Sequence, residues 1–124
     1  MPHLIIEHSS NFSDPTINNL QTGILKIIGQ FKEFDPDECK CRSHSFDEYL
    51  VGFSNKANSA FIHITLKVLT GRSVEVRKDL ASRIIKLAQD IKIDLKRCDI
   101  SVDIAEMDRA TYQKLVLLDT DIKT

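Results

Sequence analysis

Met1-Pro2-His3-Leu4-Ile5-Ile6-Glu7-His8 opens the chain, and a related stretch, His63-Ile64-Thr65-Leu66, returns sixty residues later. In the first stretch Leu4 and Ile6 alternate with side chains that point the other way, which is typical of a half-buried β-strand. The second stretch has the same alternation. A repeated strand at this spacing indicates that the fold is built from two similar halves.

The repeat extends beyond the strands. A shift of sixty residues also places Ser13 on Ser73 and the helical pattern of residues 20–26 on that of residues 80–86. The chain therefore reads as one domain, 1–124, made of two strand–helix–strand pseudo-repeats at about 2–50 and 60–108. Each unit closes with a right-handed crossover and parallel strands. The predicted fold class is α+β, a four-stranded sheet with two helices on one face.

Two helix starts are marked by capping residues. Ser13 or Asp14 can cap the first helix with Pro15 in its first turn, and Ser73 can cap the second. Apolar side chains then recur at spacings of three and four to about Phe31 and to Leu95. The remaining strands are predicted at 39–50, 60–68 and around 100–104, and a short helical turn is predicted around 112–118.

The second strand mixes small apolar and basic residues. Cys39 and Cys41 face one way, and Lys40 and Arg42 face the other. The shift of sixty would match Lys40 to Ile100, which should face the helices, whereas burial favours the cysteines there. A bulge or a one-residue slip would reconcile the two patterns.

Composition narrows the range of partners. The net charge is −1 and no block of Lys and Arg stands out, so nucleic acid and anionic membranes are poor partner candidates. We expect no membrane span and no signal peptide. Three cysteines without framework spacing fit a reducing cytoplasm. The sheet face opposite the helices needs cover, so we expect oligomerisation.

Pro2 is a candidate general base. Initiator methionine is usually removed before a residue as small as proline, which would leave a secondary amine at the start of a strand. An α-amino group titrates near about 8, and burial or a neighbouring cation lowers that value. We expect such an amine, held by a sheet beside an arginine, to be neutral near pH 7 and able to accept a proton. The competing interpretation is a chain end with no catalytic role.

Five stretches together resemble one family. They are Met1–His8, Lys40-Cys41-Arg42, Phe61–Lys67, Gly71-Arg72-Ser73 and Ser101–Ile104. In this order they are similar to 5-carboxymethyl-2-hydroxymuconate delta-isomerase, of the tautomerase superfamily. The resemblance implies a homotrimer of doubled β-α-β subunits without metal or organic cofactor.

The resemblance also implies a reaction and a site. The reaction is a proton transfer that transposes C=C bonds in an unsaturated 2-oxo acid, in the catabolism of aromatic compounds. Pro2 falls on the family's catalytic proline, and Arg72 and Arg42 fall on arginines that bind substrate. Lys40 stands where the family has a further arginine, and it offers a point charge in place of a planar fork. The tail also departs, with an apolar run at 115–118.

Other interpretations remain open. A β-α-β-β-α-β order also fits a non-catalytic ligand-binding or regulatory module, and fold alone does not decide between the two. A tautomerase fold that has lost the family activity through Lys40 is a third possibility. Cys39 and Cys41 with His44 could suggest a metal site, but buried thiols acting as small hydrophobic groups fit the pattern better.

Overall fold

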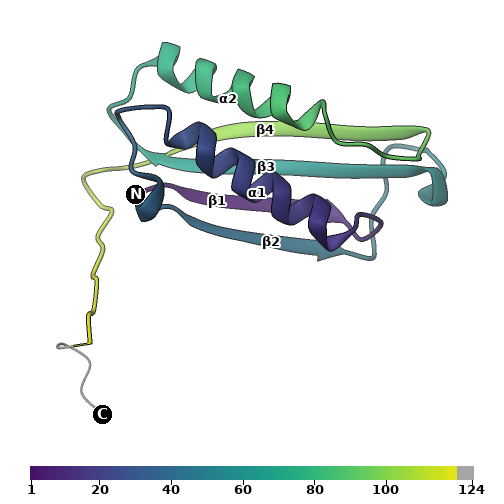
Figure 1. Ribbon diagram of the computed structural model, residues 1–124, viewed down its shortest axis with the longest axis horizontal. Helices are drawn as coiled ribbons and strands as arrows, with labels where there is room; N and C mark the ends of the chain where they lie inside the picture. The colour runs from purple at the N-terminus through teal and green to yellow at the C-terminus, as the bar shows by residue number, and fades with distance from the viewer. Residues whose placement is uncertain (120–124) are drawn as a thin grey trace.

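Four strands form one mixed sheet in the order β2-β1-β3-β4 (Figure 1). The computed structural model describes residues 1–119. The β1–β2 and β3–β4 pairs are parallel, and β1 and β3 meet antiparallel at the centre of the sheet. The strands are β1 (His3–Ser9), β2 (Lys40–Phe46), β3 (Ser59–Leu69) and β4 (Arg97–Met107). The predicted fold class is confirmed.

Each half contributes one helix, α1 (Asp14–Ile28) or α2 (Val74–Ala88). The N-cap of α1 is Ser13, one of its two predicted candidates, and that of α2 is the predicted Ser73. The Ser13 hydroxyl accepts a hydrogen bond from the Thr16 amide at 3.4 Å, and the Ser73 hydroxyl accepts one from the Val76 amide at 3.2 Å. These bonds satisfy amides that have no partner within the helix. Two short 3₁₀ helices, η1 (Pro36–Glu38) and η2 (Lys56–Asn58), precede β2 and β3.

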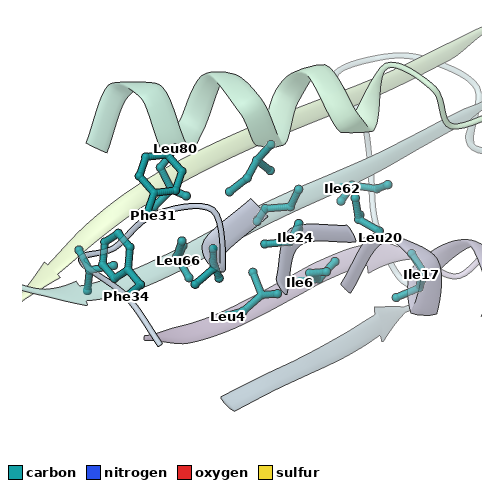
Figure 2. Close-up of a cluster of buried hydrophobic side chains, with 14 residues drawn as sticks. Leu4, Ile6, Ile17, Leu20, Ile24, Phe31, Phe34, Ile62, Leu66 and Leu80 are labelled. Carbon is teal, nitrogen blue, oxygen red and sulfur yellow. The ribbon is translucent and has the colours of Figure 1, made fainter. Parts of the chain in front are cut away.

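One hydrophobic core lies between the helices and the sheet (Figure 2). The inward side chains of β1 and β3 share this core with Ile24 of α1 and with Leu80 and Ile84 of α2, so both helices cover the same sheet face. The helices also approach closely, since a Cβ at Gly23 would lie 2.7 Å from the Leu87 side chain. Gly23 therefore makes room for contact between the two helices.

The pairing register of the outer strand differs by one residue between the two halves. His3 pairs with Lys40, whereas His63, sixty residues after His3, pairs with Ser101, sixty-one residues after Lys40. The segment between helix and final strand is thus one residue longer in the second half. This slip turns Cys41 toward the helices beside Leu4 and leaves Lys40 on the opposite face, as burial predicts.

Some predicted boundaries are wrong. Helix α2 ends at Ala88, although its apolar pattern continues toward Leu95, because the chain turns back there to enter β4. Ile91 still packs on the core from the following turn. Helix α1 ends at Ile28 instead of Phe31, and β2 ends at Phe46 instead of residue 50. After both helices a side chain, Phe31 or Ile91, still packs on the core, whereas after β2 Leu50 is exposed.

The predicted helical turn at 112–118 is also wrong. A single turn forms earlier, where the amides of Thr111 and Tyr112 donate to the Asp108 carbonyl. Beyond it the chain is irregular and leaves the sheet past the N-terminus (Figure 1). Tyr112 and Lys114 contact the start of the chain, so this segment is held by its side chains and not by helical hydrogen bonds.

Candidate active site

Pro2 lies fully buried at the entrance of β1. Its carbonyl accepts a hydrogen bond of 3.1 Å from the Lys40 amide, so the start of β1 is tied to β2. A nitrogen at this position is fixed by the sheet and withdrawn from water. Those are the conditions under which an amine loses basicity.

Four ionisable side chains act on the amino group of Met1, one residue before Pro2. Burial lowers the pKa of this amine most, and the positive charge of Arg72 lowers it next. Lys114 and Lys40 also lower the pKa, whereas Glu38 raises it. Three cations against one carboxylate favour a neutral amine, and they also favour the approach of an anion.

Arg72 is placed by the turn before α2. Gly71 has φ of 115°, a conformation that suits glycine, and Ser73 starts the helix. The Arg72 guanidinium donates to the Glu33 carbonyl at 3.1 Å and to the Leu69 carbonyl at 3.5 Å. It also lies 5.2 Å from the centre of the Phe34 ring. Arg72 is therefore held in place by protein contacts and lines a pocket of about 440 Å³.

Lys40 lines a second pocket, of about 450 Å³, together with His3, Glu38 and Lys114. Its ammonium donates to the Glu38 carbonyl at 2.9 Å and lies 3.8 Å from the Glu38 carboxylate. Lys114 binds the same carboxylate, and it lies 3.0 Å from the Met1 sulfur. These contacts keep the pKa of Glu38 below its usual range, chiefly through Lys114.

Arg42 lies farther along the same face of β2, opposite Ile5 of β1. Its guanidinium contacts the His3 ring, with 3.3 Å between Nη1 and Nδ1. The structure therefore brings Pro2, Lys40 and Arg72 around the chain start, while Arg42 approaches the group through His3.

Sequence reasoning missed Glu38, Tyr112 and Lys114. Glu38 lies between the predicted helix and the predicted strand at 39–50, and the other two lie in the tail that was predicted to form a helical turn. The available sequence signal for Glu38 was its acidic side chain directly before the predicted strand that carries Lys40 and Arg42. For Tyr112 and Lys114 the sequence gives no signal, because their contacts depend on where the tail crosses β1.

Within residues 1–119, no group of three or more His, Cys, Asp and Glu side chains is arranged to hold a metal ion. The Cys39 and Cys41 sulfurs are 3.8 Å apart, and burial, followed by the neighbouring Cys41, raises the pKa of Cys39 to about 12. In the same described range, no helix has the length and apolar character needed to cross a membrane.

The chain matches a known protein family over nearly its whole length. The profile of the family described as 5-carboxymethyl-2-hydroxymuconate isomerase matches residues 2–118. A search of curated protein sequences found no match.

Solved structures share the fold. A 5-carboxymethyl-2-hydroxymuconate isomerase from Deinococcus radiodurans R1 is 24% identical, with a TM-score of 0.82 over 92% of this chain and 88% of that one. Pt0534 inactivated by 2-oxo-3-pentynoate is 14% identical, with a TM-score of 0.69 over 97% and 94%. A fused 4-OT symmetric trimer is 12% identical, with a TM-score of 0.61 over 84% and 85%. At sequence identities below 25%, this structural similarity establishes the shared fold.

Proposed function

The chain belongs to the 5-carboxymethyl-2-hydroxymuconate isomerase family, and from that premise we propose that Pro2, freed by removal of Met1, is the base of a cofactor-independent isomerase. Its substrate is an unsaturated 2-oxo acid in its 2-hydroxydienoate form. Pro2 takes one proton from the substrate and returns one to a vinylogous carbon. The double bonds shift between these positions, so the reaction needs no other reactant.

The placement of Pro2 carries this proposal, because Pro2 is buried at the start of β1 and its carbonyl is bonded to the Lys40 amide. Burial and Arg72 already disfavour the protonated form of the Met1 amine, and the buried Pro2 lies one residue farther inside. The same causes would favour the neutral, proton-accepting form of an amine at Pro2. With Met1 attached, the Pro2 nitrogen is a tertiary amide, which has no basic lone pair.

Three cations are proposed to bind the substrate. Arg72 is close enough to the chain start to shift the pKa of its amine, so it can stabilise negative charge on the 2-oxygen and carboxylate next to the base. Lys40 and Arg42 lie together on β2 and are suited to a second carboxylate. Because Glu38 already holds the Lys40 ammonium, we propose that Arg42 is the stronger of these two contacts.

The assembly is proposed to be a homotrimer. The sheet face opposite the helices carries Ile5 and Phe61 among polar side chains, and the fused 4-OT protein of the same fold is a trimer. Sedimentation equilibrium at micromolar concentration should give three times the chain mass, and a monomer would contradict the assembly. The free thiols Cys39, Cys41 and Cys98 favour a reducing compartment such as the cytoplasm.

Two protein samples with matched oligomeric state test the proposal. One begins at Pro2 and the other retains Met1, as verified by mass spectrometry. A UV assay with 5-carboxymethyl-2-hydroxymuconate should show isomerisation by the first sample and nearly none by the second. Equal rates would exclude Pro2 as the base. Binding without turnover in both samples would favour a ligand-binding module.

A further inference from the structure

His3 lies between two residues that come from distant parts of the chain. Its Nδ1 atom is 3.3 Å from Nη1 of Arg42 on β2. Its Nε2 atom is 3.0 Å from the Tyr112 hydroxyl in the tail. The two rings meet edge to face, with centroids 6.1 Å apart. The imidazole is therefore contacted on both nitrogens.

The chemistry of arginine fixes the direction of this chain of hydrogen bonds. A guanidinium has only donors, so Nδ1 of His3 must be the acceptor. The imidazole is then neutral and carries its proton on Nε2, which donates to the Tyr112 oxygen. His3 can hold Arg42 in this way only while Nδ1 is unprotonated.

The charges around His3 favour this neutral form. Lys40 of β2 and Lys67 of β3 are its partners across the sheet, and the chain-terminal amine is nearby. Burial lowers the pKa of His3 most, followed by Arg42, Lys40, Lys67 and the amine. Glu38 lines the same pocket as His3, but its carboxylate is held by Lys114 and Lys40.

We propose that His3 is a positioning residue that holds the Arg42 guanidinium toward the substrate, and that Tyr112 fixes the imidazole in the orientation this requires. The inference rests on the proposed function of Arg42 as a substrate contact. It gives the C-terminal segment a role in substrate affinity, because Tyr112 reaches Arg42 through His3. Protonation of His3 would remove the acceptor and release Arg42, so affinity should fall at low pH.

Paired variants separate the two hydrogen bonds. In His3→Asn the amide oxygen can take the place of Nδ1 and accept from Arg42. In His3→Gln the amide reaches the place of Nε2 and loses Arg42. His63→Gln is the matched control, because His63 occupies the equivalent position of the second half and bonds to Ser101 instead.

The readout is the Kd of 2-oxoadipate, a saturated 2-oxo dicarboxylate with no double bond to move, measured by calorimetry on protein that begins at Pro2. Loss of one hydrogen bond should raise Kd about fivefold in His3→Gln. His3→Asn should bind 2-oxoadipate with a Kd close to that of the parent protein. Because asparagine does not titrate, this Kd should no longer depend on pH in the acid range. Tyr112→Phe should weaken binding in the parent protein and have no further effect in His3→Gln.

An NMR measurement tests the same hydrogen bonds without any ligand. Nitrogen-15 NMR should show the His3 ring protonated on Nε2 at neutral pH, and Arg42→Gln should raise the pKa of His3. A ring protonated on Nδ1, or equal Kd values for His3→Gln and His63→Gln, would overturn the inference.

Failure of the proposed function would look different. If 2-oxoadipate binds with the predicted pattern but the Pro2-start protein has no isomerase activity, the positioning role stands and the catalytic proposal fails. If turnover is normal and Kd is unchanged in His3→Gln, only the positioning role fails. If the parent protein does not bind 2-oxoadipate, the positioning role is overturned.

Discussion

Replacing Arg72 with glutamine should damage catalysis more than folding. The substitution removes the positive charge and keeps an amide that can donate to a backbone carbonyl. In the native protein the guanidinium donates to Glu33 and Leu69 and lies over Phe34. The question is whether these structural contacts are the whole role of Arg72 or whether its charge also acts on the amine and the substrate.

The contacts of Arg72 set the expected size of the loss in stability and of the loss in kcat/KM. Because glutamine can keep one of the two hydrogen bonds, the substitution removes one partly exposed hydrogen bond and a surface cation–π contact. Together these contribute about 1–2 kcal/mol, so the loss of unfolding free energy should stay in that range. A charge-assisted contact to a substrate carboxylate contributes about 1.5–3 kcal/mol, which is about a tenfold to hundredfold loss in kcat/KM. The catalytic effect should therefore exceed the change in stability.

The reasoning also predicts the direction in which the pH dependence of kcat/KM should move. Arg72 lowers the pKa of the Met1 amine. We expect it to act in the same direction on the Pro2 amine once Met1 is removed, so loss of Arg72 should raise the pKa of the Pro2 amine. The neutral base would then be lost at a higher pH, and the ascending limb of kcat/KM should move to higher pH. Because burial is the larger cause, the limb should still lie below the value of about 8 for an exposed amine.

The assay combines kcat/KM from pH 5 to 9 with urea unfolding, on Pro2-start protein. Arg109→Gln is the matched control, because Arg109 lines the same pocket and donates to the Thr70 carbonyl. It should leave the ascending limb in place. If Arg72→Gln lowers stability but changes neither kcat/KM nor the limb, Arg72 has a structural role only and the reasoning is refuted.

Three further predictions concern single positions. Lys40→Arg should raise kcat/KM on 5-carboxymethyl-2-hydroxymuconate about fivefold through one added hydrogen bond, and an unchanged value would leave Arg42 as the main contact. Gly71→Ala should lower the unfolding free energy by about 1–3 kcal/mol because of the φ of 115°, and urea denaturation with no loss would contradict that strain. Cys39 and Cys98 should react slowly with iodoacetamide at pH 8, since burial raises the pKa of both thiols. Labelling as fast as in urea-unfolded protein would contradict this protection.

The repeated pattern was enough to predict the architecture. Ser13 and Ser73 mark both helix starts because a hydroxyl at this position satisfies an amide that the helix cannot. Alternation in residues 60–68 predicts the long central strand because one sheet face is buried against the helices. Such signals are local, so a single sequence carries them.

The errors arose where distant segments meet. The one-residue slip between β2 and β4 depends on the length of the connections, and the alternation of Cys41 and Lys40 alone left two solutions open. Ile91 continues a helical pattern because it packs on the core from a turn, so its periodicity outlasts the helix.

The candidate site was predicted in part for the same reason. Pro2, Lys40 and Arg72 lie on elements that the repeat defines, and the structure brings them to one end of the sheet. Glu38 and Lys114 join them only because η1 and the tail cross the chain start. The interaction of His3 with Tyr112 spans nearly the whole chain and has no local signature.

Modification of Pro2 by 2-oxo-3-pentynoate tests the central claim most directly. The triple bond of this compound is conjugated to its 2-oxo group, so a neutral amine at Pro2 should add to it. Mass spectrometry of the peptides should locate one adduct per chain on Pro2, with isomerase activity lost in proportion to the modified fraction. Protein that retains Met1 should not be modified at this position. Full modification of Pro2 with activity retained, or complete inactivation by an adduct elsewhere, would contradict Pro2 as the catalytic base.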